Sequence, residues 1–182
     1  MSRFTTRQLA ADAILSAICA VLGYLAFDFL NVKISFESVP VLIAALLFGP
    51  LDGAAVGLVG TLCYQLLRYG VSATTALWIL PYVLCGLIVG WYAKRRGFEL
   101  TQAQTLAIVI CAEYMVTLLN TPVIYLDSRI YGYYRPGIVS GVLLLRLALC
   151  GAKAVIYAYA LPPLLDELRR AGIGRRRKGE EK

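Results

Sequence analysis

Arg146 and Lys153 lie seven residues apart within the last long apolar stretch of the chain. Seven residues is close to two helical turns, so both side chains point from the same face of a helix. Placing one Arg or Lys at the centre of a bilayer costs about 2.5–3.5 kcal/mol on insertion scales, and such residues usually face a partner or an internal cavity. Two aligned cations at this depth therefore indicate an anionic ligand or a coupled ion.

Two other polar residues match these cations in depth. Counting helical rise from the inner ends of the last two apolar stretches places Glu113 level with Lys153, and Asn120 level with Arg146. Glu113 and Lys153 are expected to form an ion pair, which is either structural or part of proton coupling or ligand binding. No carboxylate lies level with Arg146, so its planar fork is the better candidate to meet a ligand carboxylate or phosphate. The alternative for Arg146 is hydrogen bonding to backbone carbonyls or Asn120.

Aromatic and amide side chains reach the same outer layer of the expected structure. Tyr64 and Gln65 end one apolar stretch, while Trp78 and Tyr82 begin the next. Aromatic residues at this depth are either interfacial belt residues or the walls of a binding site. Together with Asn120, these side chains favour a site for a flat, heteroaromatic and acidic ligand, because such sites combine aromatic walls with a few fixed polar groups.

The composition requires these residues to be positioned by helices in a membrane. Of the 182 residues, 59% are hydrophobic and 16% are charged, which is more apolar surface than a soluble domain of this size can bury. We expect one all-α integral membrane domain over residues 1–182, with a core at about 8–165 and a basic cytoplasmic tail at 166–182. Hydropathy predicts helices at residues 8–30, 39–49, 51–67, 74–93, 102–125 and 138–165.

This pattern predicts a polytopic bundle of six transmembrane helices with a short second helix. Gly49-Pro50 divides the apolar block at 39–67 into a short helix and a longer one. Arg3 and Arg7 precede the first span, which favours a retained first helix and cytoplasmic termini. A five-span arrangement with an external amino terminus fits the distribution of Lys and Arg almost as well. The net charge of +7 lies mostly in short flanks of the spans, so it indicates membrane anchoring and not nucleic-acid binding.

Three further segments suggest lids or contacts. Residues 31–38 alternate apolar and polar side chains, which is typical of an ordered lid. Residues 130–136 form either a second lid or an interfacial turn. In the first helix, Ala13 and Ala17 form a small-xxx-small step, which lets another helix approach closely from within the bundle or from a partner protein.

The residues argue against catalysis. The chain contains no His, the commonest general base and metal ligand, and its five Cys form no CxxC pair. Asp52-Gly53-Ala54 is similar to the start of a lipid phosphotransferase motif, but the additional metal-binding aspartates are missing, so Asp52 is expected to cap the third helix. We expect no catalytic residue, metal site or cofactor. A structural subunit or a channel is a further alternative, although no helix carries a continuous polar stripe.

Several segments resemble the substrate-binding (S) component of energy-coupling-factor (ECF) vitamin transporters. The sharpest are Lys33-Ile-Ser-Phe-Glu-Ser-Val-Pro40, Ala44-Ala-Leu-Leu-Phe-Gly-Pro-Leu-Asp-Gly53 and Val56-Gly57. A short second helix ending in Leu-Phe-Gly-Pro, followed by a Gly-rich third helix, is typical of that group. Leu118-Leu-Asn-Thr121 and the segment from Arg146 to Lys153 resemble its folate-type subgroup.

The resemblance implies a multi-pass protein of the bacterial cytoplasmic membrane that captures a vitamin externally. It also implies that the Ala13/Ala17 face docks on a transmembrane coupling (T) component, which works with two ATPase subunits. The chain has no GxxxxGK[ST] phosphate loop, so it cannot hydrolyse ATP itself.

For folate or a related pterin, Arg146 would hold the glutamyl carboxylate, assisted by Lys153. Trp78 or Tyr82 would pack on the ring. The hydrogen-bonding groups would be Gln65 and Asn120. The nearest alternatives within the same family are pantothenate, riboflavin and a queuosine precursor.

Overall fold

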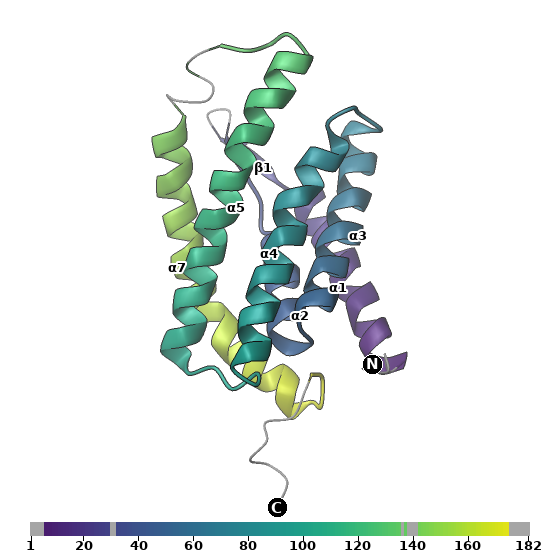
Figure 1. Cartoon of the computed structure of the whole chain (residues 1–182), viewed down its shortest axis with the longest axis vertical. Helices are drawn as coiled ribbons and strands as arrows, with labels where there is room; N and C mark the ends of the chain where they lie inside the picture. The colour runs from purple at the N-terminus through teal and green to yellow at the C-terminus, as the bar shows by residue number, and fades with distance from the viewer. Residues whose placement is uncertain (1–5, 30–31, 136, 138–141, 175–182) are drawn as a thin grey trace, which may run out of the picture.

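The computed structural model describes residues 6–29, 32–135, 137 and 142–174. In this part of the chain, six long or medium helices and one short antiparallel hairpin form a bundle (Figure 1). The elements are α1 (Thr6–Tyr24), β1 (Phe27–Phe29), β2 (Val32–Ile34), α2 (Ser38–Leu47), α3 (Pro50–Tyr69), α4 (Thr75–Arg95), α5 (Gln102–Ile130) and α7 (Leu143–Arg170). The predicted all-α membrane fold with a short second helix is confirmed.

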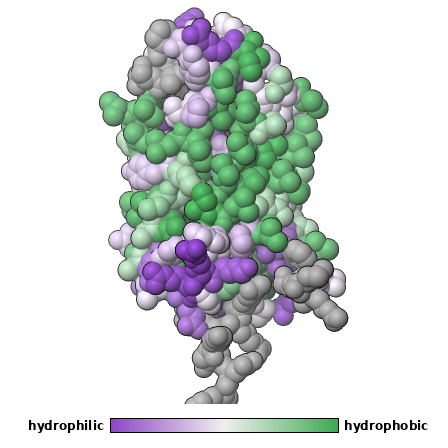
Figure 2. Space-filling view, in the orientation of Figure 1, coloured by the Kyte–Doolittle hydropathy of each residue, from purple (hydrophilic) through white to green (hydrophobic). Residues whose placement is uncertain are grey.

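Five of these helices are long and apolar enough to cross a membrane, and only α2, with 10 residues, is shorter. Figure 2 shows a broad apolar belt around the middle of the visible face, with hydrophilic residues gathered at both ends. An apolar belt is expected where a protein meets lipid chains, because lipid chains cannot form hydrogen bonds with polar groups.

α2 lies in the centre of the bundle and not at its lipid surface. It packs against α1, α3, α4 and α7, and each of its residues except Val39 is buried. At a rise of about 1.5 Å per residue, ten residues cover roughly half of a hydrocarbon core about 30 Å thick. The start of α2 therefore lies inside the bundle, and the segment that leads into it must descend from the end of the bundle opposite the two termini (Figure 1), which we call the outer end.

The predicted break between the second and third helices is confirmed at Gly49-Pro50. Gly49 has a φ of 122°, which favours glycine, and Pro50 opens α3, where its missing N–H costs no helical hydrogen bond. The expected capping role of Asp52 is wrong, because Gly49 is the N-cap residue. Asp52 lies in the first turn, is buried, and accepts a hydrogen bond of 2.6 Å from Gln8 of α1.

The first helix ends earlier than predicted, at Tyr24 and not near residue 30. The apolar residues that follow contain no stop signal, but they pair as a hairpin in which Phe27 lies opposite Ile34. Arg68 at the end of α3 donates hydrogen bonds of 3.2 and 3.3 Å to the carbonyls of Tyr24 and Ala26, which ties the hairpin to the bundle. The predicted start of the last helix at residue 138 lies outside the described residues.

α3 and α4 approach each other most closely through glycines. A Cβ added to Gly86 would lie 2.3 Å from the backbone carbon of Gly53. We expect Gly86→Ala to lower the free energy of unfolding by about 1–3 kcal/mol, because the two backbones must separate. Thermal unfolding of the detergent-solubilised protein measures this effect. Gly137→Ala is the matched control, since no atom of the described residues lies within 4 Å of its added Cβ; equal losses in both variants would contradict the prediction.

Candidate functional site

Glu37, immediately before α2, is the centre of a buried polar cluster. Glu37 is only 1% exposed, and its carboxylate accepts hydrogen bonds from Lys33, Ser35 and Tyr82. The carboxylate lies at the amino end of α2, where the helix dipole favours negative charge. We call Lys33, Ser35, Glu37, Tyr64 and Tyr82 the hairpin cluster.

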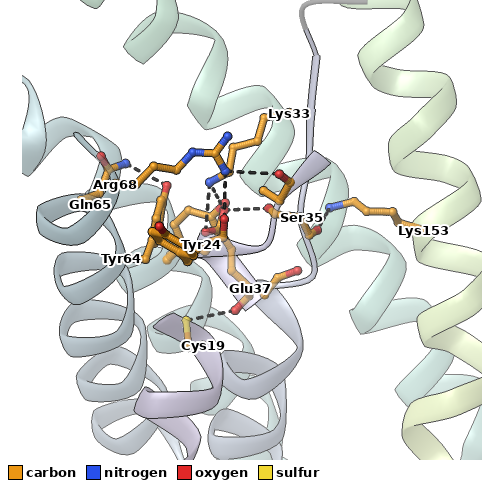
Figure 3. Close-up of polar contacts among 12 residues, drawn as sticks. Cys19, Tyr24, Lys33, Ser35, Glu37, Tyr64, Gln65, Arg68 and Lys153 are labelled. Atoms are coloured by element: carbon orange, nitrogen blue, oxygen red, sulfur yellow. Dashed lines mark hydrogen bonds and ion pairs between the residues drawn. The ribbon is translucent and has the colours of Figure 1, made fainter. Parts of the chain in front are cut away.

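Lys33 and Tyr64 complete this cluster from the hairpin and from α3. The ammonium of Lys33 lies 3.3 Å from Glu37 Oε2 and 3.9 Å from the centre of the Tyr64 ring. Gln65 donates a hydrogen bond of 2.8 Å to the hydroxyl of Tyr64. Figure 3 shows these side chains gathered around Glu37, with Tyr64, Gln65 and Arg68 on one side. A desolvated cation over an aromatic face is worth about 2 kcal/mol.

The predicted ion pair between Glu113 and Lys153 is confirmed. Lys153 Nζ lies 3.0 Å from Glu113 Oε2, and the Glu113 side chain is 2% exposed. Lys153 also donates a hydrogen bond of 3.2 Å to the carbonyl of Ser35, as it reaches the hairpin from α7 in Figure 3. Because the Ser35 hydroxyl donates to Glu37 at 2.9 Å, the ion pair and the hairpin cluster form one polar network.

Arg146 lies closer to the outer end of α7 and has only neutral partners. Its guanidinium donates hydrogen bonds of 3.2 Å to Thr121 Oγ1 and 3.3 Å to the carbonyl of Thr117. Among the described residues, no carboxylate forms a salt bridge with it. The side chain is half-buried and lies within electrostatic range of Tyr82. The alternative predicted for Arg146, hydrogen bonding to a backbone carbonyl, is present at Thr117. Asn120, the other partner considered, does not bond to it: its Oδ1 is buried and has no partner among the described residues.

Trp78 lies apart from this network, at the outer ends of α4 and α5. Its indole N–H donates to Asp127 Oδ1 at 3.3 Å, and Asp127 also accepts from Thr74 and Tyr133. Partial burial raises the pKa of Tyr133, and the hydrogen bond to Asp127 raises it further. The structure therefore gives Trp78 a contact that holds two helix ends together. Residue 136 of the second expected lid lies outside the described residues.

The structure thus brings together Tyr64, Gln65, Tyr82 and Lys153 from the predicted site, while Arg146 lies nearby and Trp78 does not join them. Sequence reasoning missed Glu37 as the centre of the cluster. The available signal was its position directly before a short helix that is apolar after Ser38, with Lys33 four residues earlier. A carboxylate at that point is pulled into the bundle with the helix that it precedes.

The cations of this region differ in their partners. Within the described residues no three His, Cys, Asp or Glu side chains are grouped to hold a metal ion. Lys33 and Lys153 face carboxylates, whereas Arg146 faces hydroxyl and carbonyl oxygens. The charge of Arg146 is therefore not neutralised by a carboxylate of the described residues.

Comparisons with known proteins identify related chains. A family model described as ECF-type riboflavin transporter, S component, matches residues 3–168. A crystal structure of FolT bound with folic acid superposes with a TM-score of 0.62 at 24% identity, covering 90% of this chain and 95% of that one. The structure of the S component of a bacterial ECF transporter gives 0.65 at 22% identity, covering 90% and 98%. No curated protein sequence matches significantly.

Proposed function

The chain belongs to the ECF-type riboflavin transporter S-component family, and from this premise we propose that it binds a folate-type vitamin. It is a multi-pass membrane transport subunit and not an enzyme. The proposed ligand class is a flat heteroaromatic ring that bears carboxylates, as in folate and related pterins. The proposed site is the outer layer of the bundle, between the hairpin cluster and Arg146.

The observation that carries this proposal is the environment of Arg146. A half-buried guanidinium with two neutral acceptors retains unused donors, because it has five N–H groups in a planar fork. A ligand carboxylate would provide the missing negative charge in bidentate geometry. Tyr64 and Tyr82 are the aromatic rings, and Gln65 and Asn120 the amides, proposed to meet the ring of the ligand. Tyr64, Tyr82 and Gln65 are buried in this structure, so the ligand would have to displace the side chains that cover them.

Titration of the purified protein with folate tests this proposal. We expect saturable binding of folate in detergent, measured by isothermal calorimetry, and folate-like compounds among the small molecules that co-purify. Pantothenate is the matched acidic control, because it has a carboxylate and no aromatic ring. Binding of pantothenate in preference to folate would overturn the proposed ligand class.

Riboflavin is the second candidate, favoured by the description of the matching family. It offers a similar flat ring but is uncharged at neutral pH, so it has no carboxylate for Arg146. Riboflavin binding would quench the flavin fluorescence on addition of protein. Tight binding of riboflavin without binding of folate would leave the vitamin-binding role intact and assign Arg146 to helix packing.

The coupling surface is proposed on α1. Ala13 and Ala17 are exposed on the side of α1 that faces away from the bundle, so a partner helix can approach the backbone closely. The partner would be the transmembrane T component, which acts with two ATPase subunits. Both termini would then face the cytoplasm of a bacterial cell, with the protein in the cytoplasmic membrane.

We expect Ala13→Leu/Ala17→Leu to abolish co-purification with the T component and to leave vitamin affinity unchanged. The added side chains hold the partner backbone away, while the vitamin site lies at the outer end of the bundle. Ala107→Leu is the control, because Ala107 is an exposed alanine on α5, away from α1 in Figure 1. A full complex formed by the double variant would contradict the assignment of this face.

A further inference from the structure

An apolar groove beside α4 lies next to the cation of Arg95. The groove has a volume of about 300 Å³ and is lined by Pro50, Leu87, Ile88 and Trp91. Ile88 is 46% exposed and Trp91 is 51% exposed, so the groove opens on the outer surface of the bundle. Such a surface in a spanning protein meets lipid chains.

The groove exists because α3 begins directly on α4. A Cβ at Gly90 would lie 2.4 Å from the nitrogen of Pro50, so only glycine permits this approach. Pro50 in the first turn of α3 forms one wall of the groove, and the turn of α4 from Leu87 to Trp91 forms the other. Neither wall presents a charged side chain to the groove, since all four lining residues are apolar or aromatic.

Arg95 supplies the charge at the end of the groove. Its guanidinium carbon lies 3.6 Å from the centre of the Trp91 ring, which fixes the cation beside the apolar surface. Within residues 6–29, 32–135, 137 and 142–174, Arg95 forms no salt bridge with a carboxylate. Lys94 precedes it and is also exposed, which adds to the positive potential at this end.

From this juxtaposition we infer that the groove is a binding site for an anionic phospholipid. One acyl chain lies along Leu87, Ile88 and Trp91, and the phosphate pairs with Arg95. The apolar walls account for the chain, and the cation accounts for the negative headgroup. A protein helix that covered the groove would need its own carboxylate beside Arg95, whereas an anionic phospholipid brings the apolar chain and the negative charge together. This site is separate from the vitamin site and does not rest on it.

Fluorescence quenching tests the inference. The chain contains two tryptophans, so Trp78→Phe leaves Trp91 as the reporter. This variant is placed in phosphatidylcholine vesicles that contain a low fraction of brominated phosphatidylglycerol or, separately, the same fraction of brominated phosphatidylcholine. We expect the anionic lipid to compete for the site about fivefold better, the advantage of one basic contact at an anionic headgroup. Native mass spectrometry of the unsubstituted chain gives the same comparison if Trp78→Phe does not fold.

Substitution of Arg95 separates the specific site from general lipid exposure. Arg95→Ala should strongly reduce the preference for the anionic lipid, to what the neighbouring Lys94 sustains, while Arg95→Lys should retain it. Arg170→Ala is the control, because it removes an exposed cation that pairs with Glu167 at 2.7 Å on another helix. Equal quenching in the Arg95-containing protein, or a preference that Arg95→Ala leaves undiminished, would overturn the inference. Displacement by glycerol phosphate, which has no acyl chain, would also overturn it.

Discussion

Replacement of Arg146 by alanine should weaken folate binding by at least about 30-fold. Truncating one partner of a buried, hydrogen-bonded charge pair typically costs about 2–5 kcal/mol, much of it from leaving the other charge unpaired. Among the described residues, the guanidinium otherwise donates only to Thr121 and to the carbonyl of Thr117. Its removal also loses these two charge-assisted hydrogen bonds to neutral acceptors, a loss that affects the stability of the protein and not the ligand contact. Isothermal calorimetry in detergent measures the change in Kd.

Arg146→Lys distinguishes charge from geometry. Lysine keeps the positive charge but not the planar fork, so an intermediate affinity is expected for a bidentate carboxylate contact. Riboflavin provides the ligand-side control, because an uncharged vitamin should bind both variants as it binds the original chain. Unchanged folate affinity in a well-folded Arg146→Ala protein would refute the contact.

Glu113→Ala should destabilise the protein by about 3–5 kcal/mol. The substitution leaves the ammonium of Lys153 in the bundle with the carbonyl of Ser35 as its remaining described polar partner, and breaking one side of a buried ion pair is strongly destabilising. The double variant Glu113→Leu/Lys153→Leu should recover much of this loss, since apolar residues of similar volume often replace a buried pair without cost. Chemical or thermal denaturation in detergent reports the free energy of unfolding.

The exposed pair between Glu167 and Arg170 is the internal control for that experiment. Both side chains are more than half exposed, at 67% and 75%, although their 2.7 Å separation is shorter than that of the buried pair. Glu167→Ala is therefore expected to change stability by no more than about 1 kcal/mol. If Glu113→Ala proved equally mild, Lys153 would have an alternative partner or would reach water.

Helix patterning predicted most of the fold because apolar length and Gly/Pro breaks are local properties. The break at Gly49-Pro50 and the ion pair of Glu113 with Lys153 both follow from positions in the chain and helical rise. Hydropathy did not predict the end of α1 at Tyr24, because residues 25–29 are as apolar as the helix before them. Their hairpin pairing is a tertiary preference that hydropathy does not encode.

The site was harder to predict, because the depth at which each side chain lies in the bundle depends on how the helices pack. Glu37 follows a polar loop and would lie in water if α2 crossed the whole bilayer; its burial results from the shortness of α2 and the descent of the hairpin. Trp78 was grouped with Tyr82 by proximity in sequence. Four residues along a helix place both on one face, but Asp127 holds Trp78 at the outer end while Tyr82 lies one turn deeper. The expected roles of Asn120 and Arg146 in ligand binding stay predictions.

The buried position of α2 also constrains how the chain is assembled after synthesis. The translocon releases a segment laterally when that segment alone is long and apolar enough for lipid, and ten residues do not reach this length. Lys33 and Glu37 make the preceding segment still less acceptable to lipid before their partners arrive. The neighbouring spans must therefore assemble first, and α2 with its hairpin is a late addition whose entry completes the bundle.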